Sequence, residues 1–300
     1  MCRPWRKLPQ RKKPNDMTIR QAIAGAVQAF EAAGVPDPRT DAEWILSYVC
    51  GLDRMRMLLA GANELTPEQE QRFSWLLLSR VQRKPLQYLL GVQYFYGLPY
   101  QVDSRVLIPR QETEELCELG IAHLRALGGT PRALDLCTGS GAIAVTLKHE
   151  CPFAEVSASD LSDDALLLAQ SNAKANGAEI QFHQGDLFVP LEGQRFDLIL
   201  SNPPYIPTQD CETLQAEVMQ EPRMALDGGV DGLDFYRRIA TEAPAHLTKN
   251  GLLAVESGDG ETEAIASLFR EAGLFSVTIH KDLYGMPRMV SAYMKEQHHV

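Results

Sequence analysis

The second half of the chain alternates short apolar segments with helical ones. Apolar, strand-like segments occur at residues 133–137, 156–160, 180–186, 196–202, 252–257, 277–282 and 289–294. Helical stretches separate the first five, whereas none separates the last two, so we expect the last two to pair antiparallel. Short helical crossovers predict a mostly parallel, doubly wound sheet of seven strands with helices on both faces. The sequence therefore predicts an α/β domain over residues 112–300.

Residues 17–90 carry helical patterns and no strand pattern. Thr18 followed by Gln21 predicts a capped helix start, and Thr66-Pro67-Glu68 predicts a second one. Apolar residues recur at helical spacing in three places: Ile19, Ile23, Ala26, Val27 and Phe30; Trp44, Ile45 and Tyr48; and Phe73, Leu76, Leu77 and Val81. We therefore expect a small helical bundle before the α/β domain.

Two further segments complete the predicted domain organisation. Residues 91–111 are rich in aromatic and β-branched side chains, and Gly97-Leu98-Pro99 is the expected turn of a β-hairpin linker. Residues 1–16 hold six Lys or Arg, one acidic residue and three prolines. Such a segment predicts a disordered basic tail, which is either a targeting tail or sequence upstream of a true start at Met17.

Composition restricts the class of protein. The net charge is -10, whereas proteins that bind nucleic-acid phosphates usually carry a positive net charge. No apolar run is long enough for a membrane span, and no apolar block follows the basic N-terminus as in a signal peptide. The six cysteines have no spacing typical of metal ligands, and His298 and His299 are expected to be a frayed tail. We expect a cytoplasmic protein with reduced thiols and no metal.

A glycine-rich turn follows the first predicted strand. The chain runs through Cys137, Thr138, Gly139, Ser140 and Gly141 into a helix that should begin at Ala142. Glycines let a backbone approach a ligand closely, and a helix N-terminus offers free N–H groups. Gly139, Gly141 and Ala144 also fit the loose fingerprint of a nicotinamide cofactor, so the turn alone does not choose the cofactor.

Acidic residues at three successive strand ends favour S-adenosylmethionine. Asp135 stands where a dinucleotide site would hold pyrophosphate, and a carboxylate there suits a cationic ligand better. Asp160 ends the second strand and is placed to accept the ribose hydroxyls. Asp186 with Leu187 follows the third strand, where an acid and an apolar neighbour can hold adenine. Each Asp alone would be read as a cap or turn residue, but three together favour a cofactor site.

The fourth strand ends in Asn202-Pro203-Pro204-Tyr205. A planar amide or aryl-amine nitrogen is a poor nucleophile because its lone pair is delocalised. Asn202 can hold its NH₂ with a side-chain oxygen and Pro203 with a backbone carbonyl, while the two prolines fix the backbone. Tyr205 can lie against a planar substrate group. The tetrapeptide therefore predicts methyl transfer by positioning, with Asn202 and Pro203 as the catalytic pair and no general base.

This tetrapeptide resembles that of the amino-methyltransferases, which act on adenine in DNA, guanine in ribosomal RNA or glutamine in protein. The flanking segments narrow the resemblance to the peptide chain release factor glutamine methyltransferases. These segments are residues 85–91, 95–97, 106–110, 112–114, 221–223 and 231–238. The resemblance runs from Met17 almost to the end of the chain.

The resemblance implies a class I S-adenosylmethionine-dependent methyltransferase that modifies the glutamine of the Gly-Gly-Gln motif in release factors. It implies that Asn202 and Pro203 hold the amide, that residues 137–141 and Asp160 bind the cofactor, and that residues 17–90 help dock the release factor. We expect Asn202 to touch the cofactor too, and the protein to be monomeric with no membrane or nucleic-acid partner. Three positions depart from the family's pattern. The family usually has glycine where this chain has Cys137 and proline where it has Gln111, and residues 283–289 differ from the family's usual motif near the end.

Two other functions remain open from the sequence. One is an amino-methyltransferase acting on an exocyclic NH₂ of adenine or guanine in RNA or DNA, against which the acidic net charge counts. The other is a non-catalytic cofactor-binding partner of translation factors. That function would require a lost acceptor pair, whereas Asn202 to Tyr205 is intact.

Overall fold

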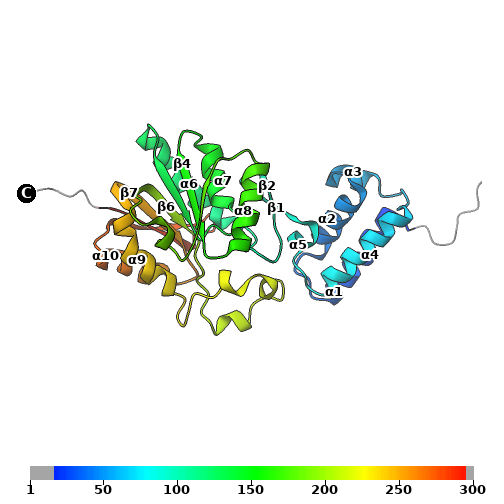
Figure 1. The fold of residues 1–300 in the computed structure, drawn as a ribbon. Helices are drawn as coiled ribbons and strands as arrows, with labels where there is room; N and C mark the ends of the chain where they lie inside the picture. Colours follow the sequence, from blue (N-terminus) through cyan, green and yellow to red (C-terminus); the bar gives the residue numbers. More distant parts are fainter. Residues whose placement is uncertain (1–16, 295–300) are drawn as a thin grey trace, which may run out of the picture. The chain divides into compact units, whose positions relative to one another are not determined.

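The computed structural model describes residues 17–294, and the predictions for residues 1–16 and for His298 and His299 lie outside the described residues. Two compact units make up the chain, one ending at Leu90 and the other beginning at Gly91 (Figure 1). None of the helices within residues 17–294 is long and apolar enough to cross a membrane.

The first unit is helical, and two of its five helices within the described residues start where the sequence predicts. The helices are α1 (Ile19–Ala32), α2 (Pro38–Cys50), α3 (Arg54–Leu59), α4 (Pro67–Val81) and α5 (Leu86–Leu90). Thr18 and Gln21 form a reciprocal capping box at the start of α1, and Thr66 and Gln69 form another at the start of α4. Each box satisfies two backbone N–H groups that the first helical turn leaves unpaired.

One face of α2 differs from the prediction. Ile45 is fully buried, but Trp44 is 41% exposed and Tyr48 39% exposed. The buried face of α2 instead runs through Ala42, Ile45, Leu46 and Val49. Consecutive helical residues are about 100° apart, so Trp44 and Tyr48 lie at the edge of this face.

A short hairpin opens the second unit. Strands β1 (Val92–Phe95) and β2 (Leu98–Gln101) pair antiparallel, with Phe95 opposite Leu98. The turn is Tyr96-Gly97, not Gly97 to Pro99, because both turn residues have positive φ, 50° and 76°, as a two-residue hairpin turn requires. Pro99 lies inside β2 although proline has no N–H to donate. This is tolerated because β1 and β2 form a sheet of two strands, so no third strand needs a hydrogen bond from Pro99.

The predicted seven-stranded, mostly parallel sheet forms the rest of this unit. Its strands are β3 (Arg132–Leu136), β4 (Glu155–Asp160), β5 (Gln181–Gln184), β6 (Phe196–Ser201), β7 (Leu247–Glu256), β8 (Phe275–Lys281) and β9 (Pro287–Tyr293). The spatial order is β5-β4-β3-β6-β7-β9-β8. The first five strands are parallel, and the last two, β8 and β9, pair antiparallel, as predicted. β9 is also antiparallel to β7.

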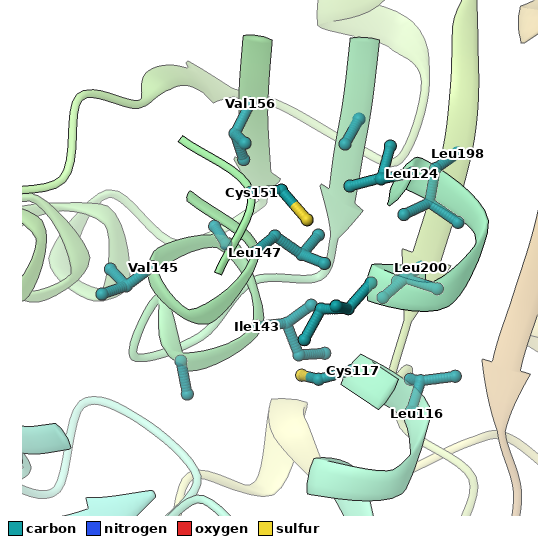
Figure 2. Packing of buried hydrophobic residues seen from close by; sticks show 14 of the residues in the cluster. Leu116, Cys117, Leu124, Ile143, Val145, Leu147, Cys151, Val156, Leu198 and Leu200 are labelled. Atoms are coloured by element: carbon teal, nitrogen blue, oxygen red, sulfur yellow. The ribbon is translucent and has the colours of Figure 1, made fainter. Parts of the chain in front are cut away.

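Helices cover both faces of this sheet. They are α6 (Glu112–Leu127), α7 (Ala142–Glu150), α8 (Asp163–Ala175), α9 (Asp234–His246) and α10 (Thr262–Glu271), with short 3-10 turns at Val189–Leu191, Asp210–Glu212, Val218–Gln220 and Arg223–Ala225. One apolar core joins α6 and α7 to the sheet, and a second joins α9 and α10 to the other face. Figure 2 shows Leu124 and Leu147 in the first core beside Leu198 and Leu200 of β6.

Residues alternate between the two cores along the central strands. Leu198 and Leu200 of β6 belong to the first core, and Ile199 between them belongs to the second. This is the two-residue period of a strand buried on both faces. The largest departure from a predicted strand start is in β7, which begins at Leu247, five residues early, because Leu247 pairs with Phe196 ahead of an irregularity in the ladder. The polar residues Lys249 and Asn250 hide this start in the sequence.

Candidate active site

A single pocket gathers most of the predicted site residues at the carboxyl ends of the parallel strands. The predicted residues that line it are Cys137, Thr138, Gly139, Ser140, Asp160, Asp186, Leu187, Asn202 and Pro204. Asp135, Gly141, Pro203 and Tyr205 are close in sequence but do not line it. All lining residues belong to the second unit.

The turn after β3 is shaped by three residues in left-handed conformations. Cys137, Gly139 and Gly141 have φ values of 64°, 54° and 81°. The turn is fastened to the neighbouring strand, because the Thr138 N–H donates to the Ser159 carbonyl at 3.0 Å. It closes on itself where the Gly141 N–H donates to the Thr138 carbonyl at 2.9 Å. A side chain at Cys137 is therefore compatible with the turn, in a conformation that favours glycine.

Asp135 lies beneath this turn. Its Oδ2 accepts hydrogen bonds from the Thr138 hydroxyl at 2.5 Å and the Ala144 N–H at 3.0 Å. Its Oδ1 is buried without a hydrogen-bond partner among the described residues, and burial raises the pKa of this carboxyl to about 7. Asp135 thus joins β3, the turn and the first turn of α7, and its predicted contact with a cationic ligand stays a prediction.

Asp160 faces the pocket from the end of β4. Its Oδ2 accepts the Gly139 N–H at 2.8 Å and its Oδ1 accepts the Ser162 N–H at 2.9 Å. Burial raises the pKa of Asp160, while these backbone donors act in the opposite direction. A carboxylate oxygen accepts more than one hydrogen bond, so both oxygens retain capacity for a ligand hydroxyl.

Asp186 and Leu187 approach the pocket after β5 ends. Asp186 pairs with Arg238 of α9 at 2.8 Å, and the side chain of Leu187 is buried. Leu187 has a φ of 47°, a left-handed conformation that is uncommon for a branched side chain. The ion pair with Arg238, which the sequence did not predict, joins this acidic side chain to α9.

Asn202 follows β6 and presents an unsatisfied acceptor. Its Nδ2 donates to the Thr113 hydroxyl at 3.2 Å, whereas its Oδ1 is buried and has no hydrogen-bond partner within residues 17–294. A buried polar atom without a partner costs about 1–3 kcal/mol, so most buried polar atoms in folded proteins have one. The arrangement leaves the side-chain oxygen of Asn202 ready to accept a hydrogen bond from a ligand.

Tyr205 packs against a glycine-rich segment. A Cβ at Gly228 would lie 2.7 Å from the Tyr205 Cα, and a Cβ at Gly232 would lie 2.4 Å from the Tyr205 carbonyl oxygen. Only glycine allows this approach at either position. Burial also raises the pKa of the Tyr205 phenol well above its usual range. The segment 228–232 therefore holds the end of the Asn-Pro-Pro-Tyr tetrapeptide in place.

A second set of pocket residues was not predicted as site residues from the sequence. They are Arg105, Val106, Leu107, Pro109, Arg110 and Thr113, together with Met224, Ala225, Asp227 and Phe235. Glu221 connects the two segments, because its carboxylate accepts the Ile108 N–H and pairs with Arg110. Most of these residues lie in or beside the segments that carry the family resemblance, which are 106–110, 112–114, 221–223 and 231–238. That resemblance was the sequence signal that could have identified them as site residues.

Two glycines of the turn allow a matched prediction about stability. Gly139 and Gly141 both have positive φ, but only a Cβ at Gly141 would meet another group, at 3.1 Å from the Ala169 Cβ. Gly139→Ala should cost the left-handed strain alone, about 1–2 kcal/mol. Gly141→Ala should cost more, because overpacking adds about 1–3 kcal/mol. Urea unfolding of both variants measures the difference, and equal midpoints would contradict the close packing of the turn on α8.

Comparisons with known proteins agree over nearly the whole chain. The PrmC N-terminal domain family matches residues 21–91, and the methyltransferase small domain family matches residues 117–230. A release factor glutamine methyltransferase from Geobacter sulfurreducens is 44% identical over 280 residues, covering 93% of this chain and 98% of the relative. One from Moorella thermoacetica is 42% identical, covering 94% of this chain and all of the relative.

Solved structures support the fold. The catalytic domain of hMettl16 superposes with a TM-score of 0.54 at 16% identity, covering 76% of this chain and 83% of that chain. A 16S rRNA N2 methyltransferase from T. thermophilus, in complex with AdoMet and guanosine, gives a TM-score of 0.50 at 21% identity, covering 68% of this chain and 50% of that chain. At these identities the likeness concerns the fold alone, a class I methyltransferase fold, as predicted. The full-length relatives identify the family: this chain belongs to the release factor glutamine methyltransferases.

Proposed function

We propose that this protein transfers a methyl group from S-adenosylmethionine to the side-chain amide nitrogen of the glutamine in the Gly-Gly-Gln motif of release factors. The observation that carries the proposal is the buried Oδ1 of Asn202, a residue that lines the pocket, because this oxygen has no hydrogen-bond partner among the described residues. An amide NH₂ is a donor of the kind this oxygen lacks. The relatives, which cover the length of the chain, name the same reaction.

The residues of the pocket fit S-adenosylmethionine, the cofactor of this class of methyltransferase. Asp160 offers carboxylate oxygens to ribose hydroxyls, and Leu187 offers an apolar surface to adenine. Gly139 lines the pocket, and a Cβ built there meets nothing within 4 Å, so the backbone is open to close approach. We assign cofactor binding to Cys137, Thr138, Gly139, Ser140, Asp160, Asp186, Leu187 and Asn202, with Asp135 and Gly141 supporting the turn.

The protein's own groups then position the amide. Asn202 Oδ1 and the Pro203 carbonyl accept the two N–H bonds, which leaves the nitrogen lone pair facing the cofactor. When bound, S-adenosylmethionine would supply a methyl group on a sulfonium sulfur, which would keep the electron pair of the C–S bond and leave as a neutral thioether as the nitrogen lone pair forms the C–N bond. The nitrogen becomes strongly acidic on gaining the methyl and releases a proton to water, so no general base is required. Pro203 and Pro204, both trans, restrict the backbone that aims the carbonyl.

Substrate docking and location extend this proposal. We infer that residues 17–90 contact the release factor, that the second unit carries out the chemistry, and that the enzyme works as a monomer in the cytoplasm. An exocyclic NH₂ of a nucleic-acid base is the alternative acceptor. The net charge of -10 disfavours it, because nucleic-acid binding needs a basic surface.

A labelling experiment tests the choice of substrate. The protein is supplied with cofactor carrying a labelled methyl group, together with a purified release factor, the same factor with its Gly-Gly-Gln glutamine replaced by alanine, and ribosomal RNA. We expect label on the intact factor only. Label on RNA, or on the alanine-substituted factor, would contradict the proposal.

Asn202→Ala should lower turnover far more than cofactor affinity, because Asn202 is one of eight residues assigned to the cofactor but one of only two acceptors for the amide. The variant loses one acceptor that is oriented for the amide, and losing one such partner costs about 10²–10³ in rate. Methyl transfer to the release factor gives kcat, and calorimetry with S-adenosylhomocysteine gives the affinity. Turnover near that of the unmodified protein would remove the basis of the mechanism.

Asp160→Ala should weaken cofactor binding. Hydrogen bonds to a charged acceptor contribute about 1.5–3 kcal/mol each, and the variant loses the acceptor proposed for the ribose hydroxyls. Asp163→Ala is the matched control, since Asp163 is exposed in the first turn of α8 and does not line the pocket. Calorimetry with S-adenosylhomocysteine should separate the two variants, and equal affinities would overturn the assignment of Asp160.

A further inference from the structure

We propose that Glu256 and Thr113 form a hydrogen-bonded chain with Asn202 that fixes which end of the Asn202 amide faces the substrate. This inference rests on the proposed function, since it explains how the acceptor for the glutamine amide is oriented. Thr113 and Glu256 act through Asn202 and are positioning residues. Neither was predicted as a site residue from the sequence.

The three side chains meet from three separate elements. Thr113 lies in the first turn of α6, Glu256 is the last residue of β7, and Asn202 follows β6. The Thr113 hydroxyl donates to Glu256 Oε2 at 2.6 Å, and Asn202 Nδ2 donates to Thr113 Oγ1 at 3.2 Å. Thr113 is 5% exposed and Glu256 3% exposed, so water does not compete for these bonds.

The direction of the hydrogen bonds follows from the chemistry of the groups. An ionised carboxylate only accepts, so the single proton of the Thr113 hydroxyl is committed to Glu256. The remaining lone pairs of Thr113 require a donor, and the NH₂ of Asn202 is the end of the amide that can donate. The two ends of an amide have nearly the same shape, so packing alone does not select between them. Glu256 therefore turns Asn202 Oδ1 away from Thr113, which agrees with an Oδ1 that is buried and accepts no hydrogen bond from residues 17–294.

A purely local role does not account for Thr113. A threonine in a first helical turn often caps its own helix, but the N-cap of α6 is Gln111, and no side chain caps that end. The Thr113 hydroxyl instead connects residues that are 143 and 89 positions away in the sequence. Its bonds join two neighbouring strand ends at the pocket.

Removing the Thr113 hydroxyl should lower turnover more than binding. In Thr113→Val the Asn202 amide loses the acceptor that orients it, and we expect kcat to fall by about 10-fold to 100-fold with little change in affinity for S-adenosylhomocysteine. Thr113→Ser restores the hydroxyl and should recover most of the loss. Thr146→Val is the matched control, because Thr146 is also buried and hydrogen-bonded, to Tyr100, but does not line the pocket.

A double-mutant cycle separates this role from general damage to the fold. If Thr113 acts through Asn202, Thr113→Val should have no further effect on kcat in the Asn202→Ala background. An undiminished effect in that background would overturn the proposal, as would a kcat unchanged by Thr113→Val.

The pH dependence of kcat gives a second kinetic test. Burial raises the pKa of Glu256 to about 7. The titratable groups around it are Arg110, Glu112, Cys117, Tyr205, Tyr236 and Arg288. Below its pKa the carboxyl can donate a proton to Thr113, which frees the Thr113 proton for Asn202 Oδ1 and reverses the amide. We therefore expect kcat to fall as the pH decreases through about 7.

The variant Glu256→Gln identifies the group responsible for this pH dependence. Burial also raises the pKa values of Asp135 and Glu261 to about 7, so the wild-type profile alone does not assign the fall. Glutamine can donate at every pH, so this variant should have a low kcat without the fall that Glu256 causes. A fall in kcat equal to that of the wild type would overturn the role of Glu256.

A measurement without substrate tests the chain even if the proposed function fails. In ¹⁵N NMR spectra, the NH₂ signals that disappear in Asn202→Ala belong to Asn202. We expect Thr113→Val to shift these signals and Thr113→Ser to leave them close to their wild-type positions. Unshifted signals in Thr113→Val would show that the chain does not hold Asn202, whereas failure of the wild type to label a release factor would count against the proposed function alone.

Discussion

The register of three parallel strands sets the position of the whole site. Leu136 of β3 lies opposite Ser159 of β4 on one side and Ser201 of β6 on the other. The Ser201 hydroxyl also donates to the Leu136 carbonyl at 2.7 Å. Because Leu136, Ser159 and Ser201 lie level across the sheet, the next residues along each chain, Cys137, Asp160 and Asn202, lie side by side at one edge. A shift of one residue in either pairing would turn a site residue toward the opposite face of the sheet.

Carboxylates hold the loops around this edge. Asp160 accepts N–H groups from Gly139 and Ser162, Glu221 accepts the Ile108 N–H, and Glu261 accepts the Gly258 N–H. Asp160 and Glu221 reach Gly139 and Ile108 in distant segments, whereas the bonds to Ser162 and Gly258 close local turns. Hydrogen bonds to charged acceptors are shorter and stronger than neutral ones, so a few of them can fix loops that bury little apolar surface. The same burial raises the pKa values of Asp160, Glu221 and Glu261.

The sequence predicted the elements whose signals are local in the chain. Strand apolarity, the capping residues Thr18 and Thr66, and the glycine-rich turn depend on neighbours within a few positions, and the structure contains them. The exposure of Trp44 depends on which helices pack against α2, which spacing alone does not reveal. The chain from Glu256 through Thr113 likewise joins residues far apart in sequence, so only the folded sheet brings them together.

The uncompensated oxygen of Asn202 connects stability to chemistry. The buried Oδ1 of Asn202 accepts no hydrogen bond within the described residues, which lowers the free energy of unfolding. The charged form of the Glu256 carboxyl lowers it further, because burial removes its hydration. A donor from the substrate recovers part of that cost only when it reaches Asn202. The desolvated groups therefore do not have to reorganise when the amide arrives, which is the condition under which fixed dipoles accelerate a reaction most. The buried acceptor of Asn202 thus lies where positioning contributes most to the proposed rate.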